Sequence, residues 1–418
     1  MSFNTLKGFK NASYLTIGNI ITQILSFFAV IYIARELGVS NYGIYITVGT
    51  FVSLFQIFLL SGMNRVIIRE GSKNIEKLSF LINQTFALRS ICIIIAIIIC
   101  ILFSSFMSYD LLTKTLIILH STQLGYHGFR GILNSVYQVH EKMYYMSLFK
   151  VTNRLLFVLL SIYLLYLGYG VISLFIVMLL TNIITLIGNY TISTKFFKFS
   201  PNFTFKNIDP LIIKSSLVFS LLAFVGFLTT KIDLLMISFL GGLSEVGRYG
   251  AAYKLVRQGM VLRNMTSVAF FPMIVKYIKV QKINQSKIIL ISFLTFIIFS
   301  IFSIFIYLFS NPIIILLFGE DYVDSGEILK YLILFIPIWW AALPYTIIAQ
   351  SIHKEKIILY SRSFMAILNI ILNYILYLKY GLIGVVYSTL FIYYAGSLLI
   401  IIWTHRTLNK EGFFSLNQ

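Results

Sequence analysis

The sequence predicts an all-α polytopic membrane protein, and three observations support this fold class. The chain of 418 residues is 59% hydrophobic and only 11% charged, whereas an ordinary soluble domain has about 25% charged residues. The apolar residues form long runs such as Ile91–Phe103, Leu155–Leu167 and Ile288–Phe309. The cations gather in the short segments between such runs. Because roughly 20 apolar residues in a helix span the hydrocarbon of a bilayer, these runs indicate transmembrane helices.

We expect 12 transmembrane helices. The first follows Lys7 and Lys10 as a signal peptide would, but no convincing small-residue cleavage site follows it, so we interpret it as a retained helix. The segment Asn311–Glu327 is expected to be the longest outside loop. The expected spans are residues 12–34, 41–63, 81–105, 110–137, 144–167, 170–191, 213–240, 247–275, 288–309, 327–350, 357–378 and 381–403.

The loop charges alternate along the chain and predict that both termini are cytoplasmic. Cations of membrane proteins are enriched in the cytoplasmic loops. The outside segments of this arrangement hold only Arg35, Arg248 and Lys379. The inside segments hold Lys7, Lys10, Arg65, Arg69, Lys73, Lys77, Lys142, Lys195, Lys198, Lys206, Lys214, Lys276, Lys279, Lys282, Lys287, Lys354, Lys356, Arg406 and Lys410. The net charge of +19 therefore reflects topology, and no nucleic-acid partner is expected.

Short motifs recur in the two halves of the chain. The pair Tyr42-Gly43 recurs as Tyr249-Gly250, 207 residues later, and Tyr169-Gly170 recurs as Tyr380-Gly381, 211 residues later. The basic turn at His140 recurs 213 residues later, at His353. Chance recurrence at membrane interfaces is the alternative for each motif, but the common offset favours two parallel six-helix lobes. We expect the lobes at residues 1–194 and 213–418, joined by a cytoplasmic linker at 195–212.

Ionisable residues within the expected spans predict a cationic, substrate-binding lumen. A charge that faces lipid at mid-bilayer costs at least ~2.5–3.5 kcal/mol, so most of these side chains must face water, a partner or a ligand. Snorkelling to the headgroups is the interpretation for Lys150, near the inner end of its helix, and the alternative for Arg89. An excess of cations favours an anionic cargo such as a phosphate or pyrophosphate. The candidates are Arg89, His127, Arg130, Arg154, Lys231, Lys254, Arg257 and Arg263.

The fourth expected helix carries a polar stripe. Such a stripe is either the wall of a cavity or a buried hydrogen-bonded seam, and we favour the cavity wall. Arg89, Arg130 and Arg154 lie about 10–16 Å from the inner ends of their helices, which places them to form one cationic zone. The stripe consists of His120, Gln123, His127, Arg130, Asn134 and Gln138, whose spacings of three and four residues put them on one helical face.

Asp233 is the only carboxylate found well inside an expected span. It precedes Ser244, the expected turn between two helices, by 11 residues, and Lys254 and Arg257 follow that turn by 10 and 13 residues. The three side chains are therefore placed to pair. A lone membrane carboxylate beside cations is a candidate proton or sodium site, and a static bridge between Asp233 and an arginine is the alternative. We expect no cofactor and no other metal.

Several passages resemble the Wzx type of polysaccharide flippase, in the multidrug/oligosaccharidyl-lipid/polysaccharide (MOP) exporter superfamily. Together they cover nearly the whole chain in the order typical of the superfamily. They are Ile33–Gly38 leading to Tyr42–Tyr45, Ser61–Arg65 with Arg69-Glu70, Lys231-Ile232-Asp233, Gly247–Leu255 and Phe318–Tyr322.

The resemblance implies a V-shaped pair of six-helix bundles that works by alternating access. It implies a multi-pass protein of the bacterial inner membrane, with membrane lipids and other polysaccharide-assembly proteins as partners. The implied cargo is an oligosaccharide repeat unit, such as O-antigen of lipopolysaccharide, linked by pyrophosphate to undecaprenyl and flipped from the cytoplasmic to the periplasmic leaflet. Related lipid II flippases usually have fourteen helices and arginines on the first two. Here those helices offer Asn19, Gln23 and Gln56 instead.

Three other functions compete with this interpretation. A lipid II flippase is one, although the residues of the first two helices depart from its pattern. An exporter of cationic drugs would require lumenal carboxylates, and only Asp233 qualifies. A membrane-embedded glycan polymerase or glycosyltransferase would require a large outside catalytic loop or a DxD motif, and the sequence shows neither. A transporter rather than an enzyme is therefore expected.

Overall fold

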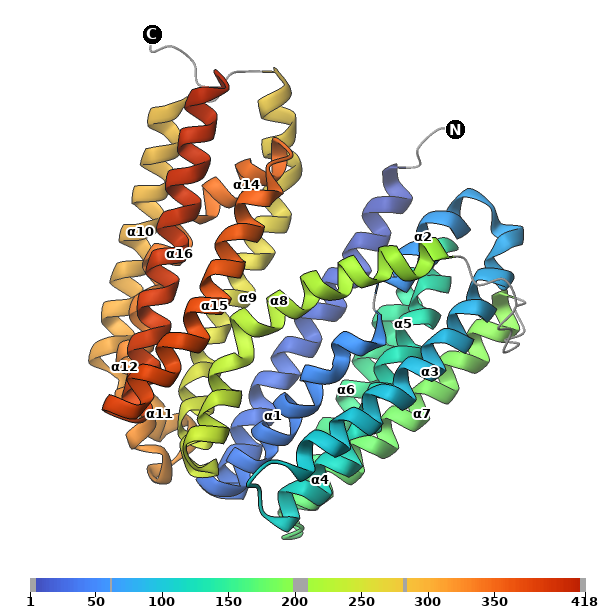
Figure 1. Ribbon diagram of the computed structural model, residues 1–418, viewed down its shortest axis with the longest axis horizontal. Coiled ribbons are helices and arrows are strands. Elements are labelled where there is room, and N and C mark those ends of the chain that lie inside the picture. The colour runs from blue at the N-terminus through green and yellow to red at the C-terminus, as the bar shows by residue number, and fades with distance from the viewer. Residues whose placement is uncertain (1–4, 61, 198–209, 281–283, 414–418) are drawn as a thin grey trace. The chain divides into compact units, whose positions relative to one another are not determined.

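The computed structural model describes residues 5–60, 62–197, 210–280 and 284–413, and all regular elements in these ranges are helices (Figure 1). The predicted all-α class is therefore confirmed. The helices are α1 (Thr5–Leu54), η1 (Phe55–Leu59), α2 (Met63–Lys73), η2 (Ile75–Lys77), α3 (Leu78–Ser105), α4 (Leu111–Ser121), α5 (Gln123–Val139), α6 (Met143–Tyr166), α7 (Val171–Phe197), α8 (Pro210–Leu240), α9 (Leu243–Val280), α10 (Gln285–Leu308), α11 (Ser310–Phe318), η3 (Glu320–Tyr322), α12 (Asp324–Leu332), η4 (Ile333–Phe335), α13 (Ile336–Ala341), α14 (Leu343–Ser351), α15 (Glu355–Tyr380) and α16 (Leu382–Lys410).

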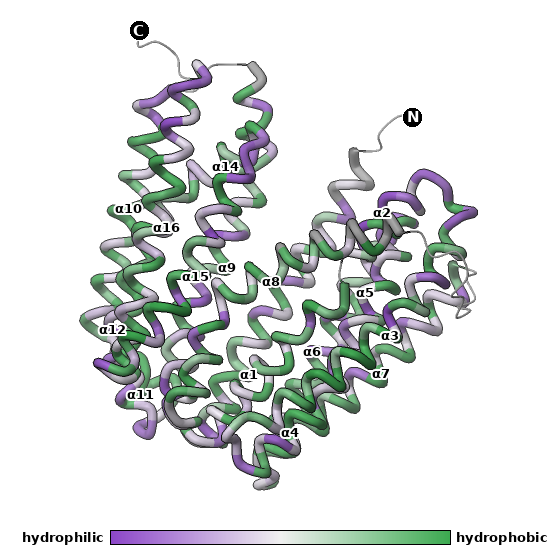
Figure 2. The backbone as a smooth tube through the Cα atoms, viewed as in Figure 1, coloured by the Kyte–Doolittle hydropathy of each residue, from purple (hydrophilic) through white to green (hydrophobic). Residues whose placement is uncertain are grey.

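The apolar surface of these helices identifies a membrane protein. On α10, the side chains of Phe293, Ile298 and Ile301 are 58%, 59% and 65% exposed. Figure 2 shows α10 as largely hydrophobic, while hydrophilic residues gather around α2. A soluble monomer rarely exposes so large a contiguous apolar face, so this face contacts lipid.

Eight helices in the described residues are long and apolar enough to cross a membrane, or nine if a bent pair counts as one span. The predicted count of 12 stays a prediction. Two of the expected spans lie in α1 and η1, and α1 is kinked at Gly38, whose φ of 68° and ψ of 174° are not helical. Such a φ favours glycine. The 38 residues of α9 are long enough to span, but this helix is too polar to be counted.

The chain forms two compact units, Met1–Phe224 and Val225–Gln418. The first unit includes α1–α7 and the beginning of α8, and the second includes the rest of α8 and α9–α16. Residues 198–209 of the predicted linker lie outside the described residues, so the predicted boundaries at 194 and 213 stay predictions. The described ends of that linker, residues 195–197 and 210–212, are helical.

The core of the first unit joins four helices. In it Ile67 of α2, Ile82 of α3, and Ile132 and Leu133 of α5 are almost fully buried, and Leu186 of α7 packs against them. α1 packs on α6, and α6 packs on α7. In the second unit α15 lies against α16, while α9 contacts α12 and α14. Each unit therefore has its own core.

The basic turns predicted at His140 and His353 have the same geometry. Glu141 and His353 both adopt the left-handed conformation, with φ angles of 54° and 58°. In each turn the next residue donates its N–H to the carbonyl five residues earlier, at 2.8 Å. This is the Schellman arrangement that ends a helix. Its presence at corresponding places in the two units supports the internal repeat.

Pro337 and Pro344 lie in a membrane helix that is broken. The segments Asp324–Ala341 and Leu343–Ser351 are bent by 41° relative to each other. Pro337 has no N–H to offer the carbonyl of Ile333 four residues earlier. That carbonyl accepts the backbone N–H of Ile336 and, at 3.2 Å, the hydroxyl of Ser303 of α10 instead. Such substitution is required because an unsatisfied carbonyl in hydrocarbon costs several kcal/mol.

The predicted outside loop Asn311–Glu327 is wrong. This segment is helical in α11, η3 and α12, and Gly319, with a φ of 96°, ends α11. The run of apolar residues before Gly319 favours a helix. The acidic residues after Gly319 led to the whole segment being interpreted as a loop. The acidic side chain of Asp324 pairs with Arg248 of α9 at 3.3 Å, and both are exposed.

The hydrogen bond from Ser303 to the carbonyl of Ile333 can be tested by mutation. Ser303→Ala should lower the free energy of unfolding by about 0.5–1.5 kcal/mol, because the carbonyl of Ile333 loses one of two donors and keeps the N–H of Ile336. In the background of Pro337→Ala the same change should cost less, since residue 337 then has its own N–H. Thermal unfolding of the four proteins in detergent measures both costs. An equal loss in the two backgrounds would contradict the role of Ser303.

Candidate functional site

Arg89 is buried against a break in the backbone and does not line an accessible cavity. Only 1% of its surface is exposed. Its Nη2 donates to the carbonyl of Leu60 at 3.4 Å and to Oδ1 of Asn64 at 3.1 Å. Leu60 ends η1 in the left-handed conformation. The structure thus corrects the expectation for Arg89, whose charge is used where the helical hydrogen bonding is interrupted.

Arg263 makes the same kind of contact in the second unit. It is 4% exposed, and its Nε donates to the carbonyl of Trp339 at 3.0 Å, next to the break between α13 and α14. Its Nη2 donates to Oγ1 of Thr346 at 3.1 Å, and the guanidinium lies 4.3 Å from the ring centroid of Trp339. Arg263 is therefore held by the broken helix and is also removed from the expected lumen.

Three cations of the first unit remain accessible and form a group. Arg130 of α5 and Lys150 and Arg154 of α6 are all half-buried, and Arg130 and Lys150 lie within electrostatic range of each other. The Lys150 ammonium donates to Oδ1 of Asn19 on α1. In the described part of the chain, Arg130, Lys150 and Arg154 take part in no ion pair.

Aromatic rings support the two arginines of this group. The guanidinium of Arg130 lies 5.1 Å from the ring centroid of Tyr126, and that of Arg154 lies 5.0 Å from the ring centroid of Phe157. The Nε of Arg154 is buried with no hydrogen-bond partner in the described structure. Rings attract a cation through the negative face of their π-system without neutralising it. The group therefore keeps its net positive charge for a ligand.

The predicted polar stripe lies on the accessible side of α4 and α5. His127 and Arg130 are half-buried, whereas Ile132 and Leu133 on the other side are 0% and 1% exposed. His120 departs from the stripe, because it is buried with its ring 5.1 Å from that of Phe175. The helix breaks between α4 and α5 at residue 122, just after His120. The accessibility of the stripe after this break favours the cavity-wall interpretation.

The second unit has its own cationic group on α8 and α9. Lys231 and Lys254 are half-buried and Arg257 is exposed. Lys231 lies within electrostatic range of Arg257, and its ammonium is 5.9 Å from the ring centroid of Phe227. Six of the eight predicted residues therefore remain accessible. They are His127, Arg130 and Arg154 in the first unit and Lys231, Lys254 and Arg257 in the second.

Asp233 lies in a buried network of neutral polar groups. It is 5% exposed. Its Oδ2 accepts hydrogen bonds from the hydroxyls of Tyr249 at 3.0 Å and Thr389 at 3.2 Å, and its Oδ1 accepts one from Nδ2 of Asn373 at 2.8 Å. The Nδ2 of Asn373 also donates to Oδ1 of Asn369 at 2.6 Å. Four helices, α8, α9, α15 and α16, therefore meet at this carboxylate.

The predicted pairing of Asp233 with Lys254 or Arg257 is wrong, and the position of the turn explains the error. α8 ends at Leu240 and α9 begins at Leu243, so the hairpin turns two to three residues before Ser244. Residues at equal depth on the two helices lie at equal distances in sequence from the turn. If the turn moves by two or three residues, the residue opposite Asp233 therefore moves by about five. The residue of α9 level with Asp233 is therefore near position 250, and Tyr249 is the one that contacts it.

Sequence reasoning missed the partners of Asp233 on α15 and α16. Asn369 and Asn373 are four residues apart in an apolar helix and are 3% and 0% exposed. Polar residues at that spacing share a helical face, which was the available signal. It would have predicted a buried polar seam on α15, although not which helix that seam meets.

The family described as "Polysaccharide biosynthesis protein" matches residues 9–278, well over half of the chain. The chain belongs to this family. No match is found among curated protein sequences. The family assignment agrees with the resemblance found in the sequence.

Solved structures share the fold of this family member at low sequence identity. The lipid II flippase MurJ, in its inward closed conformation, has a TM-score of 0.76 at 19% identity over 93% of this chain and 87% of that chain. An inward-facing MATE multidrug transporter of the MOP superfamily has a TM-score of 0.73 at 18% identity over 97% of this chain and 100% of that chain. A MOP superfamily transporter from Pyrococcus furiosus has a TM-score of 0.60 at 16% identity over 96% and 93% of the two chains. The protein therefore has the MOP fold.

The Asp233 network allows a double-mutant test of its charge. Tyr249→Phe should lower the free energy of unfolding by about 1.5–3 kcal/mol if its hydroxyl bonds an ionised carboxylate. The same change in Asp233→Asn should cost about 0.5–1.5 kcal/mol, the value for a neutral hydrogen bond. Chemical or thermal unfolding in detergent gives the coupling between the two positions. Additive effects would show that Tyr249 does not act on a charged Asp233.

Proposed function

We propose that the protein is a flippase for an oligosaccharide linked to undecaprenyl through pyrophosphate. It moves the sugar and its pyrophosphate from the cytoplasmic to the periplasmic leaflet, as O-antigen or a related surface polysaccharide requires. Membership of the polysaccharide biosynthesis family supports the cargo class. The observation that carries the proposal is the group of Arg130, Lys150 and Arg154, accessible cations that no carboxylate neutralises in the described residues.

The chemistry of these cations suits a phosphate. A guanidinium presents its N–H donors as a planar fork that matches phosphate oxygens in pairs, and an ammonium adds a compact charge. Arg130 and Arg154 are held on aromatic rings, so their side chains lose little conformational entropy when they bind an anion. A pyrophosphate carries its negative charge on several oxygens and can engage two or three cations at once.

The cationic group of the second unit gives the cargo another set of partners. Lys231, Lys254 and Arg257 belong to a different compact unit from Arg130 and Arg154. Alternating access rocks parts of a transporter around a bound cargo. Each unit offers its own group of cations to the pyrophosphate, with both termini in the cytoplasm as the loop charges predict.

The buried carboxylate of Asp233 in the second unit fits ion coupling. Asp233 supplies one negative charge, which matches one proton or one monovalent cation. The Oγ1 of Thr389 and the Oη of Tyr249 lie within hydrogen-bonding distance of this carboxylate, and Asn373 links it to Oδ1 of Asn369. Oxygen donors of this kind are the ligands that hard cations prefer. We infer that a proton or sodium gradient drives transport through this network.

Arg130→Ala and Arg257→Ala test the cationic groups. Each should reduce surface glycan about 10- to 150-fold, since a hydrogen bond to a charged group contributes about 1.5–3 kcal/mol and 1.4 kcal/mol is tenfold. The assay is glycan display in cells that depend on this protein, with the amount of membrane-inserted protein measured in parallel. Arg406→Ala is the control, because Arg406 is exposed near the end of α16. Normal glycan in both variants would overturn the cationic-group model.

The same cells separate the cargo classes. Rescue of a strain that lacks its lipid II flippase, without restored surface glycan, would favour lipid II as cargo. A change of glycan length produced by the purified protein would favour a polymerase. Accumulation of lipid-linked repeat units on the cytoplasmic side in the variants supports the flippase.

Asp233→Asn tests ion coupling in proteoliposomes. The native protein should transport faster when a proton or sodium gradient is imposed, whereas Asp233→Asn should transport at a rate independent of both gradients. Asp324→Asn is the control, since Asp324 is an exposed carboxylate that pairs with Arg248. If Asp233→Asn keeps its gradient dependence, the carboxylate is not the coupling site.

A further inference from the structure

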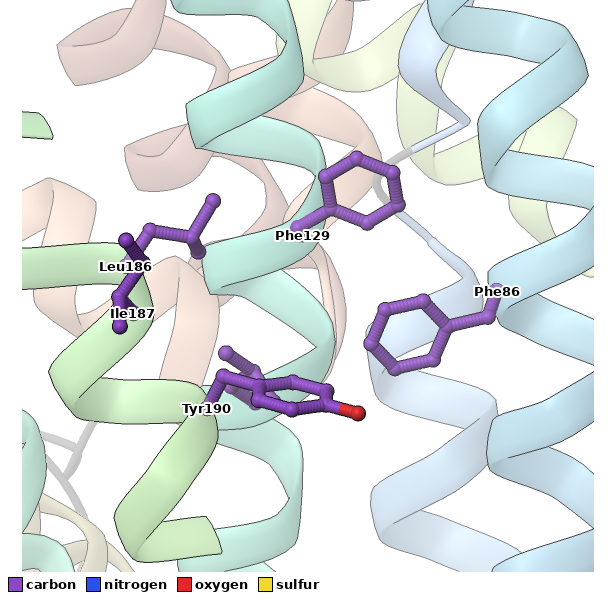
Figure 3. Close-up of a pocket in the computed structure, with 6 residues that line it drawn as sticks. Phe86, Phe129, Leu186, Ile187 and Tyr190 are labelled. Carbon is purple, nitrogen blue, oxygen red and sulfur yellow. The ribbon is translucent and has the colours of Figure 1, made fainter. Parts of the chain in front are cut away.

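An apolar pocket of about 260 Å³ lies between three helices of the first unit. Its lining consists of Phe86 of α3, Phe129 and Leu133 of α5, and Leu186, Ile187 and Tyr190 of α7. Figure 3 shows the rings of Phe86, Phe129 and Tyr190 arranged around it, with Leu186 and Ile187 further along α7. The rings of Phe86 and Phe129 are stacked, with centroids 5.5 Å apart. The pocket is separate from the cationic groups and from Asp233.

The pocket opens on a face of α7 that contacts the bilayer. Ile187, which lines it, is 60% exposed, and the neighbouring Ile183 and Ile184 are 45% and 55% exposed. Both α3 and α7 are among the helices long and apolar enough to span. Water does not occupy an apolar pocket without polar partners, so the surrounding hydrocarbon is what reaches this opening.

The depth of the pocket suits one end of a lipid chain. Its residues lie 6–11 residues from the ends of α5 and α7, at Val139 and Phe197, and eight residues from the start of α3, at Leu78. At 1.5 Å per residue this is roughly 9–17 Å from those helix ends. A bilayer leaflet has about 15 Å of hydrocarbon, half of the ~30 Å core. The pocket therefore lies at the level of acyl chains within one leaflet.

The same ends of these three helices carry exposed lysines. Lys77 precedes α3, Lys142 follows α5, and Lys195 lies in the last turn of α7. Two acidic residues, Glu76 and Glu141, adjoin the first two lysines and are also exposed. The lysines exceed the carboxylates, and a long lysine side chain reaches toward headgroups while its stem stays on apolar surface. Anionic headgroups are attracted to such clusters within a Debye length.

We propose that this pocket binds one hydrocarbon chain of an anionic phospholipid of the surrounding bilayer, with the lipid phosphate near Lys77, Lys142 and Lys195. The occupant is a resident lipid and differs from the transported cargo. It fills the space between α3, α5 and α7 that the side chains of the protein leave open. The lipid therefore acts as a part of the first unit, and its binding does not depend on the proposed transport function.

The experiment uses the full-length protein in vesicles of phosphatidylcholine with a small fraction of phosphatidylglycerol that carries a photoreactive group on its acyl chain. After illumination, labelled peptides are mapped by mass spectrometry. Labelling of α3, α5 and α7 at the pocket should exceed labelling of α10 several-fold, because the apolar side chains of α10 are exposed to lipid and do not line this pocket. Equal labelling of the two surfaces would overturn the proposal.

Two matched variants test the site itself. Ile187→Trp places an indole at the opening and should reduce pocket labelling several-fold, whereas Ile183→Trp changes an exposed residue of the same helix outside the lining and should leave it unchanged. Labelling of α10 in each variant reports whether the protein is inserted. If Ile187→Trp labels as the native protein does, or if a second copy of the chain is cross-linked at this face instead, the lipid site is wrong.

A third comparison tests the headgroup. The double substitution Lys77→Gln with Lys195→Gln should lower labelling by the phosphatidylglycerol probe toward that of a phosphatidylcholine probe with the same acyl chain. In the native protein the anionic probe should label the pocket more strongly. Equal labelling by the two probes in the native protein would overturn the anionic preference. Normal surface glycan in the lysine variant would be compatible with the lipid site, which separates this proposal from the flippase function.

Discussion

The structure depends on one constraint, which is that a backbone polar group inside a membrane must have a partner. A continuous helix meets this requirement by itself, but this chain interrupts its helices at Leu60 and around Pro337. At both of these interruptions a side chain from another helix donates to a backbone carbonyl, although the carbonyl of Leu60 also accepts the N–H of Met63. Arg89 contacts the carbonyl of Leu60, and Arg263 contacts that of Trp339. In each unit a hydrogen bond between helices therefore forms where a helix is interrupted.

This constraint divides the charged residues into two classes with different physical roles. Arg263 donates to one backbone carbonyl and to the hydroxyl of Thr346, and it is buried. Arg130 lies over the ring of Tyr126 and donates to its hydroxyl at 3.5 Å, which leaves its other donors available. Both kinds look identical in a sequence, because each is an arginine in an apolar run. The position of the helix breaks in space decides which arginine is buried against the backbone and which stays accessible.

The sequence therefore predicted the fold more completely than the site. Length and hydropathy identify membrane helices because the thickness of the bilayer imposes them, and the positions of Pro337 and Pro344 identify a break because proline lacks an N–H. Depth along a helix can also be read from the sequence, but its error doubles across a hairpin. That is why Asp233 was matched with Lys254 and Arg257 and in fact contacts Tyr249. Contacts between distant helices, such as that of Asp233 with Asn373, leave only a polar spacing as their signal.

The internal repeat adds a reason to regard the Asp233 network as functional. Tyr42 and Tyr249, which mark the repeat, are both buried and both stack on a tyrosine one turn later, with ring centroids 6.2 and 5.8 Å apart. At the same offset of 207 residues, however, the counterpart of Asp233 is Ser26, which donates to a carbonyl of its own helix. A packing role shared by the repeat would favour similar residues in both units. A buried carboxylate present in one unit alone costs stability there without serving the common fold, and ion coupling requires only one such site.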